Sequence, residues 1–314
     1  MPMSLHVAGT GFTVMDRVYS TGEPRFQTLG GSCGNVLVSL AMLSHNVAPV
    51  LRLGDDEVGD ELVLEFAQAG AWTQFIRRWP GRSSPVLAQH LDTRSGQHSF
   101  SFVCPETERD FPRYEPIEGD EVDKARSALK ACQVFYTDRV SPGIVQAMET
   151  AADAGAVIYF EPSAIGDHDL FSRAIALSNI IKCSSDRLDD LLALATLQEG
   201  AVAIVTRGAD GLDLWHDNQR THCPAIPAPI VRDTCGSGDM VTVGLIDRIL
   251  DQVTSYRSPA FENILEGVMA GQRLAAANCA YPGARGLFQM HGAKTVRRLL
   301  DDPQWDIDLQ LDLF

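Results

Sequence analysis

The stretch Asp233-Thr234-Cys235-Gly236-Ser237-Gly238-Asp239 runs directly into an apolar helical pattern over residues 240–250. Two glycines and a serine therefore stand where a helix begins, and the first N–H groups of a helix have no intrahelical acceptor. Together with the helix dipole, these groups can hold a phosphate or a developing oxyanion. Asp239 is then a carboxylate beside an anion site, a pairing suited to phosphoryl transfer. An aspartate in a first helical turn is also a common cap, so this stretch needs support from the rest of the chain.

Outward from this stretch, short apolar runs alternate with helical patterns along most of the chain. We expect strands over residues 5–9, 50–53, 134–137, 157–161, 180–182, 202–206 and 212–215. We expect helices near residues 34–45, 58–70, 121–131, 142–154, 167–177, 185–197, 237–252 and 259–280. This alternation predicts an α/β fold with a parallel sheet, helices on both of its faces, and ligands at the carboxyl ends of its strands.

Two segments, near residues 17–29 and 72–111, interrupt the alternation. Within the second, residues 86–91 and 99–103 flank a polar run and predict a β-hairpin. Strands inserted into a βα framework are expected to form a small sheet at the active-site edge, a lid that excludes water. Such a lid could pair its edges between two copies, and we expect a homodimer. We find no internal repeat or linker and interpret residues 1–314 as one domain.

The bulk composition limits the classes of partner. The 314 residues carry a formal net charge of −15, which argues against nucleic-acid binding because phosphate backbones are bound by clustered Lys and Arg. Seven cysteines without a C-x-x-C pair indicate reduced thiols rather than disulfides or zinc ligands. The start lacks a basic segment followed by an apolar run, and no apolar stretch is long enough to cross a bilayer. We therefore expect a cytoplasmic protein without a membrane partner.

Three further motifs have residue types suited to a small ligand. Gly30-Gly31-Ser32-Cys33-Gly34-Asn35 precedes a helix, where paired glycines permit close approach of a ligand and the Asn35 amide offers a donor and an acceptor to hydroxyls. Thr206-Arg207-Gly208-Ala209-Asp210-Gly211 ends one strand and turns into the next, a turn able to contact a nucleotide. Gly54-Asp55-Asp56-Glu57-Val58-Gly59 opens another helix, and its spacing fits helix capping rather than a calcium loop.

Taken together and in this order, the motifs resemble the pfkB (ribokinase-like) family of sugar and nucleoside kinases. The resemblance covers nearly the whole chain. It implies a ribokinase-like three-layer α/β/α sandwich with a mostly parallel central sheet and a small β lid. It further implies transfer of the γ-phosphate of ATP to a hydroxyl of a small sugar or sugar acid. In that reaction Asp239 is the base, and the anion hole consists of Gly236, Ser237 and Gly238.

The resemblance also assigns two binding regions. Residues expected to hold the substrate are Asp16, Gly30, Gly31 and Asn35. Residues expected to border ATP are Thr206, Gly208, Gly211, Cys235 and Asn278, the last at the position where the family contacts adenine. We expect Arg139 to bind an acidic group of the substrate, with a solvated surface position as the alternative.

Two segments depart from the family pattern. Where the family has an N-x-x-E motif that helps to place Mg²⁺, this chain has Lys182-Cys183-Ser184-Ser185-Asp186-Arg187-Leu188, and the usual D-P-N segment is Glu161-Pro162-Ser163. Either Glu161 or Asp186 is expected to compensate as a metal ligand, or metal placement is altered and turnover is reduced. The resemblance implies ATP and Mg²⁺ as cofactors and leaves room for a monovalent cation.

Other functions stay open at this point. One is a nucleoside kinase of the same family, and another is a catalytically idle binder of nucleotide or sugar, which only the altered segment at 182–188 supports. A dinucleotide-dependent oxidoreductase is suggested by Gly9-Thr10-Gly11, but the third glycine of that fingerprint is replaced by Val14. A Walker-type NTPase finds no matching phosphate-binding motif in the chain.

Overall fold

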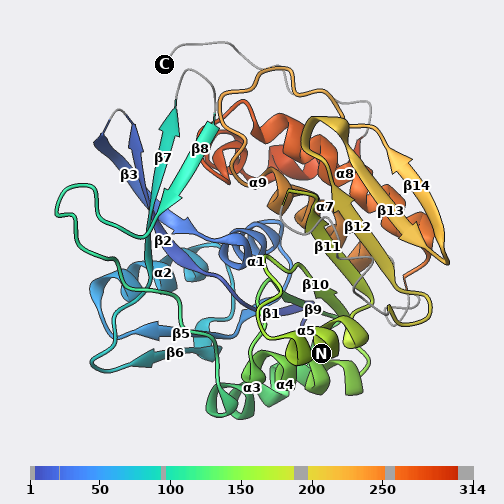
Figure 1. Cartoon of the computed structure of the whole chain (residues 1–314), viewed down its shortest axis with the longest axis horizontal. Coiled ribbons are helices and arrows are strands. Elements are labelled where there is room, and N and C mark those ends of the chain that lie inside the picture. The colour runs from blue at the N-terminus through green and yellow to red at the C-terminus, as the bar shows by residue number, and fades with distance from the viewer. Residues whose placement is uncertain (1–3, 21, 93–96, 187–196, 252–258, 303–314) are drawn as a thin grey trace.

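The computed structural model describes residues 4–20, 22–92, 97–186, 197–251 and 259–302. At its centre is an eight-stranded sheet (Figure 1). The spatial order of its strands is β14 (Gln219–Cys223), β13 (Leu212–His216), β12 (Val202–Thr206), β11 (Ile180–Ser184), β10 (Val157–Phe160), β9 (Val134–Thr137), β1 (Val7–Thr10) and β4 (Val47–Pro49). The six strands from β4 to β12 are parallel, and β13 and β14 join them antiparallel. The predicted, mostly parallel central sheet is therefore present.

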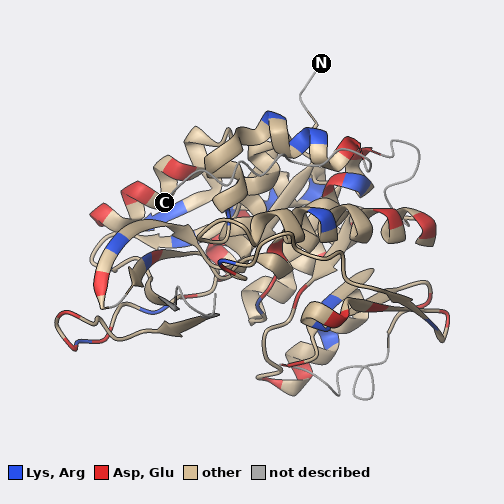
Figure 2. Ribbon diagram, turned by 90° about the horizontal axis from the view of Figure 1, so that it is seen from above, with Lys and Arg blue, Asp and Glu red and all other residues tan. Residues whose placement is uncertain are grey.

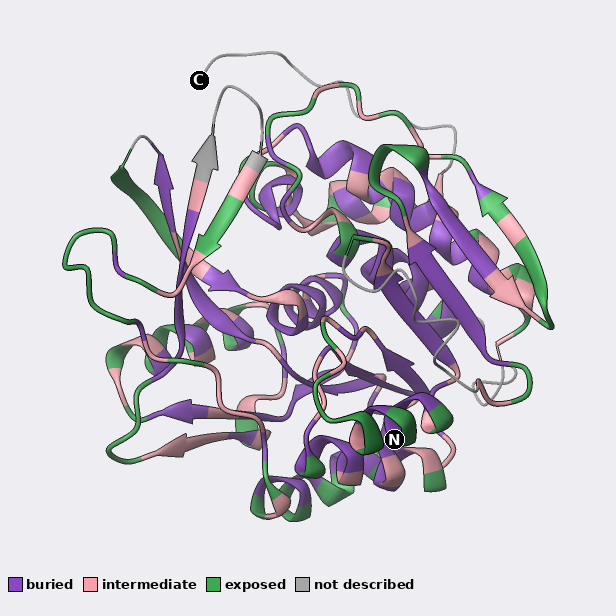
Figure 3. Ribbon diagram, viewed as in Figure 1, coloured by how far each residue is buried: buried purple, intermediate pink, exposed green. Residues whose placement is uncertain are grey.

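Helices cover both faces of this sheet and make three layers. One face carries α1 (Ser32–Met42), α7 (Ser237–Asp251), α8 (Phe261–Asn278) and α9 (Gly286–Asp301), with α2 (Glu57–Gln68) next to α1. The other face carries α3 (Gly119–Ala131), α4 (Pro142–Asp153) and α5 (His168–Leu177). Side chains alternate along each strand, so Val134 and Tyr136 enter one hydrophobic core while Phe135 enters the other. Figure 3 shows the central strands buried between the helices.

A second sheet of four strands stands beside the central one (Figure 1). Its order is β3 (Glu23–Gly30), β2 (Val14–Ser20), β7 (Val86–Asp92) and β8 (Gln97–Ser101), and we call it the lid sheet. It consists of two antiparallel hairpins joined by a parallel pairing of β2 with β7. The segment near residues 17–29 and the hairpin predicted within residues 72–111 both lie in this sheet.

One expected strand has a different place. The strand predicted over residues 50–53 is β5 (Leu51–Gly54), which pairs with β6 (Ile76–Trp79) in a separate two-stranded sheet. The central sheet takes β4 instead, through the register Val7↔Val47. Residues 47–53 are almost continuously apolar, so periodicity does not distinguish which part of the run pairs with which neighbour. The prediction of a central strand at 50–53 is therefore wrong.

The prediction also omitted β14 and α9, in addition to β4 and β6. The polar sequence of β14 gives no strand pattern, and the glycines at positions 286 and 292 interrupt the periodicity of α9, which is kinked at Gly292. The helix expected at 185–197 and the turn of the second lid hairpin fall mainly outside the described residues.

The distribution of charged residues and the length of the apolar helices bear on which partners are expected, nucleic acid or a membrane. Figure 2 shows basic residues scattered among acidic ones over the described ribbon. Among the same residues, no helix combines the length and apolar character needed to span a bilayer.

Candidate active site

The loop before α7 leaves several backbone amides free. Gly236 has a φ of 74°, and a Cβ atom there would lie 2.6 Å from Ala284, so only glycine fits. The N–H groups of Gly236, Gly238 and Asp239 have no hydrogen-bond partner among the described residues. The N–H of Ser237, which was also expected in the anion hole, donates to the Thr234 carbonyl at 3.3 Å. Unpaired amides at a helix start, together with the helix dipole, attract an anion.

Two buried side chains hold this loop against the segment that precedes α9. The Asp233 carboxylate accepts from the amide of Cys235 (2.9 Å) through one oxygen and from that of Gly283 (2.7 Å) through the other. The amide of Asn278 donates to the carbonyls of Cys235 and Gly283, and its oxygen accepts from the N–H of Leu287 (3.0 Å). Asn278 is completely buried, so its contact with adenine stays a prediction.

Asp239 lies in the first turn of α7 and is 7% exposed. Asn35, which lies on α1, donates from Nδ2 to Asp239 Oδ2 at 2.8 Å. Burial and, to a smaller extent, the charge of Glu161 raise the pKa of Asp239 to about 7, against the lowering effects of the Asn35 hydrogen bond and the charge of Lys182. A carboxyl group with a pKa near neutral pH is suited to receive a proton from a reacting group.

Asp16, on β2, is the second buried carboxyl group of the site. Its side chain passes so close to Gly30 that a Cβ atom there would lie 1.8 Å from Oδ2, and the N–H of Gly31 donates to the carboxylate. Burial raises the pKa of Asp16 to about 7, against the lowering effect of Arg285 and with a further rise from Asp239. The Oδ1 atom of Asp16 has no hydrogen-bond partner.

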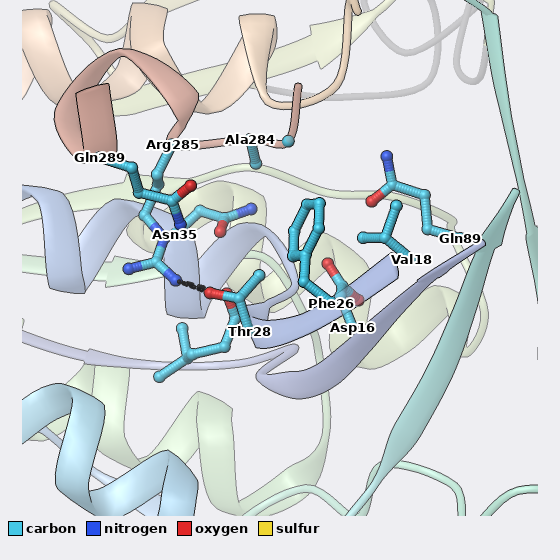
Figure 4. Close-up of a pocket in the computed structure, with 11 residues that line it drawn as sticks. Asp16, Val18, Phe26, Thr28, Asn35, Gln89, Ala284, Arg285 and Gln289 are labelled. Carbon is cyan, nitrogen blue, oxygen red and sulfur yellow. Dashed lines mark hydrogen bonds between the residues drawn. The ribbon is translucent and has the colours of Figure 1, made fainter. Parts of the chain in front are cut away.

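Asp16 and Asn35 line one pocket beneath the lid sheet. Lid side chains, α1 and the segment 283–289 enclose it (Figure 4). Figure 4 places Arg285 and Asn35 on one side, Gln89 on the other, and Asp16 between them. The free space is about 10 Å³, room for a single water molecule. This space is too small for a sugar, so the pocket must widen before a sugar can bind there.

Arg139 follows β9 and lies beside the loop between β1 and β2. It donates from Nη1 to Asp138 Oδ2 at 3.0 Å and stacks over the ring of Phe12 at 4.5 Å. The other oxygen of Asp138 accepts from the Phe12 amide at 2.8 Å, and burial raises the pKa of Asp138 to about 6. The guanidinium of Arg139 thus already has a carboxylate partner.

Three of the residues expected near ATP, Thr206, Gly208 and Gly211, lie at the carboxyl end of β12. Thr206 ends that strand and accepts from the Ser185 amide at 3.0 Å, and the turn continues through the exposed Gly208 to Gly211, where β13 begins. Because β10, β11 and β12 are parallel, their ends share this edge of the sheet with Glu161 and Lys182.

Glu161 and Lys182 form a buried ion pair at the same edge. The carboxylate of Glu161 accepts from Lys182 Nζ, from the Thr242 hydroxyl (2.7 Å) and from the Tyr136 hydroxyl (3.2 Å). Lys182 is 2% exposed and also donates to the carbonyl of Gly238 at 3.1 Å. The pair therefore connects β10 and β11 to the first turn of α7.

Comparison with known proteins identifies the family. The sequence model of the pfkB family carbohydrate kinases matches residues 20–289. The chain belongs to the pfkB carbohydrate kinase family. This pfkB kinase is accordingly a phosphotransferase with an alcohol group as acceptor. A fructokinase from Vibrio alginolyticus is 25% identical to it over 256 residues, 76% of this chain and 81% of that protein.

Solved structures support the fold. Fructokinase from Xylella fastidiosa, crystallised with bound ATP, matches the pfkB kinase with a TM-score of 0.73 and 21% identity, over 96% of this chain and 100% of the other. Ribokinase from Giardia lamblia matches with a TM-score of 0.74 and 14% identity over the same shares. The predicted ribokinase-like sandwich is confirmed.

Among the residues that the structure describes, the pfkB kinase does not present a metal site of its own. Glu161 is neutralised by Lys182, and Asp186 is exposed in the turn after β11. Within the described residues, no three acidic, His or Cys side chains are grouped to hold a metal ion. The residues present therefore do not fit a metal ion held by the protein alone, and the assignment of Glu161 and Asp186 stays a prediction.

The sequence prediction left out two residues that organise the site of the pfkB kinase. Arg285 donates from Nη2 to the Leu29 carbonyl (2.6 Å), to Thr28 Oγ1 (2.9 Å) and to Glu65 Oε2 (3.0 Å), which joins the start of α9 to the base of the lid sheet. Lys182 was noted only as part of an altered motif. A lysine inside an otherwise apolar strand could have indicated a functional residue from the sequence alone, whereas no sequence pattern around Arg285 indicates its role.

Proposed function

We propose that the chain transfers the γ-phosphate of ATP to a hydroxyl group of a small sugar. The observation that supports this most strongly is the hydrogen bond from Asn35 to Asp239, because Asn35 also lines the pocket beneath the lid. The base is thereby adjacent both to the pocket and to the free amides at the start of α7.

The chemical roles follow from this placement. The sugar hydroxyl gives its proton to the Asp239 carboxylate while its oxygen bonds to the γ-phosphorus, and the bond from that phosphorus to the bridging oxygen of ADP breaks. The amides of Gly236, Gly238 and Asp239 stabilise the negative charge of the phosphoryl group. Asp16 orients the sugar by accepting from another hydroxyl. Closure of the lid excludes water, which would otherwise compete for the phosphoryl group.

ATP is proposed as the donor because the turn at Thr206–Gly211 and the amides before α7 provide polar backbone at the sheet edge. Mg²⁺ is proposed to arrive on the phosphates of ATP, since Glu161 already has a lysine partner.

A sugar is preferred to a nucleoside as the acceptor. The named curated relatives include fructokinases, and the pocket is lined by polar groups that suit hydroxyls. A nucleoside acceptor is the second candidate, because Phe26 also lines the pocket and could pack against a base.

We further propose a homodimer formed through the lid sheet. Its edge strands β3 and β8 carry the exposed Phe26 and Phe100, and pairing between copies would cover them. A reducing compartment such as the cytoplasm is proposed because all seven cysteines are buried and none of them forms a disulfide bond. Light scattering gives the mass in solution, and a monomer at micromolar concentration contradicts the dimer.

The function is tested by ADP release in the presence of ATP and Mg²⁺. The acceptors are D-fructose, other neutral hexoses and pentoses, gluconate, fructose 6-phosphate and adenosine. We expect turnover with a neutral sugar. Stoichiometric ATP binding without ADP release for any acceptor contradicts the proposal.

A further inference from the structure

A buried carboxylate at some distance from the pocket joins the ends of three helices. Asp247 lies on α7, about two turns beyond the base Asp239, and is 3% exposed. Its Oδ1 atom lies 2.6 Å from Nε2 of His45, which follows α1. Arg297, on α9, donates from Nη2 to Oδ1 at 2.8 Å and from Nη1 to Oδ2 at 2.9 Å. We call the side chains of His45, Asp247 and Arg297 the clamp.

The clamp is attached to the C-terminal end of α1. The N–H of His45 donates to the carbonyl of Leu40 in the last turn of that helix at 3.1 Å. Nη2 of Arg297 donates to the carbonyl of Leu43, the C-cap residue, at 3.1 Å. An ionised carboxylate only accepts hydrogen bonds, so Nε2 of His45 carries the proton in its contact with Asp247. Directed hydrogen bonds therefore join the end of α1 to α7 and α9.

The same two helices, α1 and α7, also meet at the base. Asn35, near the start of α1, donates to Asp239 in the first turn of α7. Positions 35 and 45 thus face positions 239 and 247, so the helices run in the same direction with a polar contact near each end. Between these contacts the buried side chains of α1 are mostly apolar. Apolar packing is non-directional, whereas a catalytic group must be held to within about 0.5 Å.

Another face of α7 is held by close backbone packing. A Cβ atom on Gly244 would lie 2.4 Å from the amide nitrogen of Gly271 on α8, and one on Gly271 would lie 2.4 Å from the carbonyl oxygen of Val241. These glycines let the two helices approach closely, so α7 and α8 pack as one unit. The position of Asn35 relative to the base then depends on how α1 is attached to that unit.

The clamp is surrounded by groups of both charges. The ring centroid of His6 lies 5.6 Å from that of His45, Asp251 follows one turn later on α7, and Asp301 on α9 lies 3.8 Å from Nη1 of Arg297. Both oxygens of the buried Asp247 carboxylate have partners. The clamp therefore acts through the helices that it joins and not through a ligand.

We propose that His45, Asp247 and Arg297 are positioning residues for the kinase reaction. The clamp fixes α1 against α7, and α1 thereby holds the Asn35 amide in contact with the Asp239 carboxylate. This proposal rests on the role of Asp239 as the base, proposed above. It assigns to a buried ion pair outside the pocket the task of keeping the base in its orientation.

The first test compares two variants of His45. His45→Leu removes the donor, whereas His45→Gln keeps an N–H group for Asp247 and carries no charge. We expect His45→Leu to lower kcat/KM for the best acceptor roughly tenfold, because small displacements at a reacting group are costly. The Asn35 bond lowers the pKa of Asp239, so the acidic limb of kcat/KM should move to higher pH by about half a unit. His45→Gln should keep the parental rate and limb.

A second measurement does not depend on turnover. The pKa of Asp239 is followed by carbon NMR of protein labelled in its aspartate carboxyl groups, with the signal assigned by Asp239→Asn. His45→Leu should raise this pKa by about half a unit, and Asn35→Ala should raise it at least as much. Added to Asn35→Ala, His45→Leu should cause no further rise, because both changes act on the same hydrogen bond.

Two further variants control for stability. Arg297→Lys keeps the charge but loses the two-pronged contact with Asp247, and it replaces His45→Leu if that protein does not fold. Met148→Ala lies on α4, in the hydrophobic core on the opposite face of the central sheet from α1. It should lower the melting temperature because it leaves a cavity, and the acidic limb should stay in place.

The outcomes separate the two proposals. Absence of turnover by the parent with every acceptor overturns the kinase function, whereas a raised pKa of Asp239 in His45→Leu still supports the clamp. An unchanged pKa and an unchanged limb in both His45→Leu and Arg297→Lys overturn the positioning role and leave the function intact. A further rise of the pKa when His45→Leu is added to Asn35→Ala also overturns that role, because the clamp then acts by another route.

Discussion

Asn35 and Asp239 are 204 positions apart in the chain, and one hydrogen bond of 2.8 Å joins them. That bond orients the carboxylate and stabilises its charged form, while burial and Glu161 act in the opposite direction. The resulting pKa near neutrality makes Asp239 a stronger base than an exposed aspartate, whose low pKa gives little driving force for proton transfer.

Replacement of Asp239 tests the base directly. We expect Asp239→Asn to reduce kcat on the order of 10²–10⁴-fold, because the proton acceptor is lost while shape and the Asn35 contact are kept. Binding of ATP, measured by titration calorimetry, should be retained. The control is Asp217→Asn, at an exposed position. An Asp239→Asn protein with the parental rate removes the basis for this assignment.

The pH profile gives a second test. Asp239 and Asp16 both have pKa values raised to about 7, and both act as ionised carboxylates in the proposed mechanism. The kcat/KM should therefore fall as pH decreases through about 7 and level off above it. Steady-state assays from pH 5.5 to 9 measure this. A profile that is flat below pH 7 is incompatible with these roles.

Lys182 is expected to set the position of that profile. Its charge lowers the pKa of Asp239, so Lys182→Met should move the acidic limb of kcat/KM to higher pH, by about 0.5–1 unit. Lys130→Met, near the end of α3, is the surface control. A limb that stays in place shows that Lys182 has only a structural role.

Among the elements, the lid sheet is the one whose position decides access. Its inner face contacts the loop before α7 at two points, through Gln89 at Cys235 and through His98, whose Nδ1 lies 3.5 Å from Asp233 Oδ1. Both contacts hold the lid sheet against that loop in this structure. The small pocket volume agrees with this, and opening of the lid must precede entry of a sugar.

His98→Ala should weaken the closed state of the lid. We expect KM for the sugar to rise by roughly 3–10-fold, because a favourable contact of the closed form is lost and the competent conformation is less populated. The KM for ATP and the melting temperature serve as internal checks. The control variant is His168→Ala, at an exposed position of α5. An unchanged sugar KM means that His98 does not contribute to closure.

At the scale of the whole molecule, the buried carboxyl groups of the active site lower the free energy of unfolding at neutral pH. Asp16, Asp239 and Asp138 have pKa values raised to about 7, 7 and 6, so the folded state binds protons more tightly than the unfolded chain. Stability should therefore fall as pH rises from about 4 to 7. The raised pKa of Asp251 adds to this effect. The lowered pKa of His6 acts in the opposite direction, as do the lowered pKa values of Asp56, Glu118 and Asp213 at the acidic end of the range.

Thermal unfolding measures this effect. We expect the melting temperature to be higher at pH 5.5 than at pH 8, and Asp239→Asn to be more stable than the parent at pH 8 by about 2–4 °C, since a buried charge is removed. The pH dependence of the variant should also be shallower. A variant that is less stable at pH 8 contradicts the account of Asp239 as a strained buried carboxylate.

The amino-acid sequence alone determined the local features of this protein. Apolar periodicity located most strands and helices. Roles in the site could be predicted for Gly236, Gly30 and Asp239 from neighbouring residues alone, because a helix start and a close backbone approach require these residue types. The ordered motifs then predicted the family and its fold, which the comparisons confirmed.

Only the tertiary structure decided which distant groups meet. The pairing of Asn35 with Asp239, of Lys182 with Glu161, and the contacts of Arg285 depend on strand order, register and helix packing. In the same way, the sequence did not indicate that β4, and not the strand expected at 50–53, pairs in the central sheet. Local patterns define which face of an element is buried, but many pairings bury the same apolar area, and the choice among them is made by the packing of the whole chain.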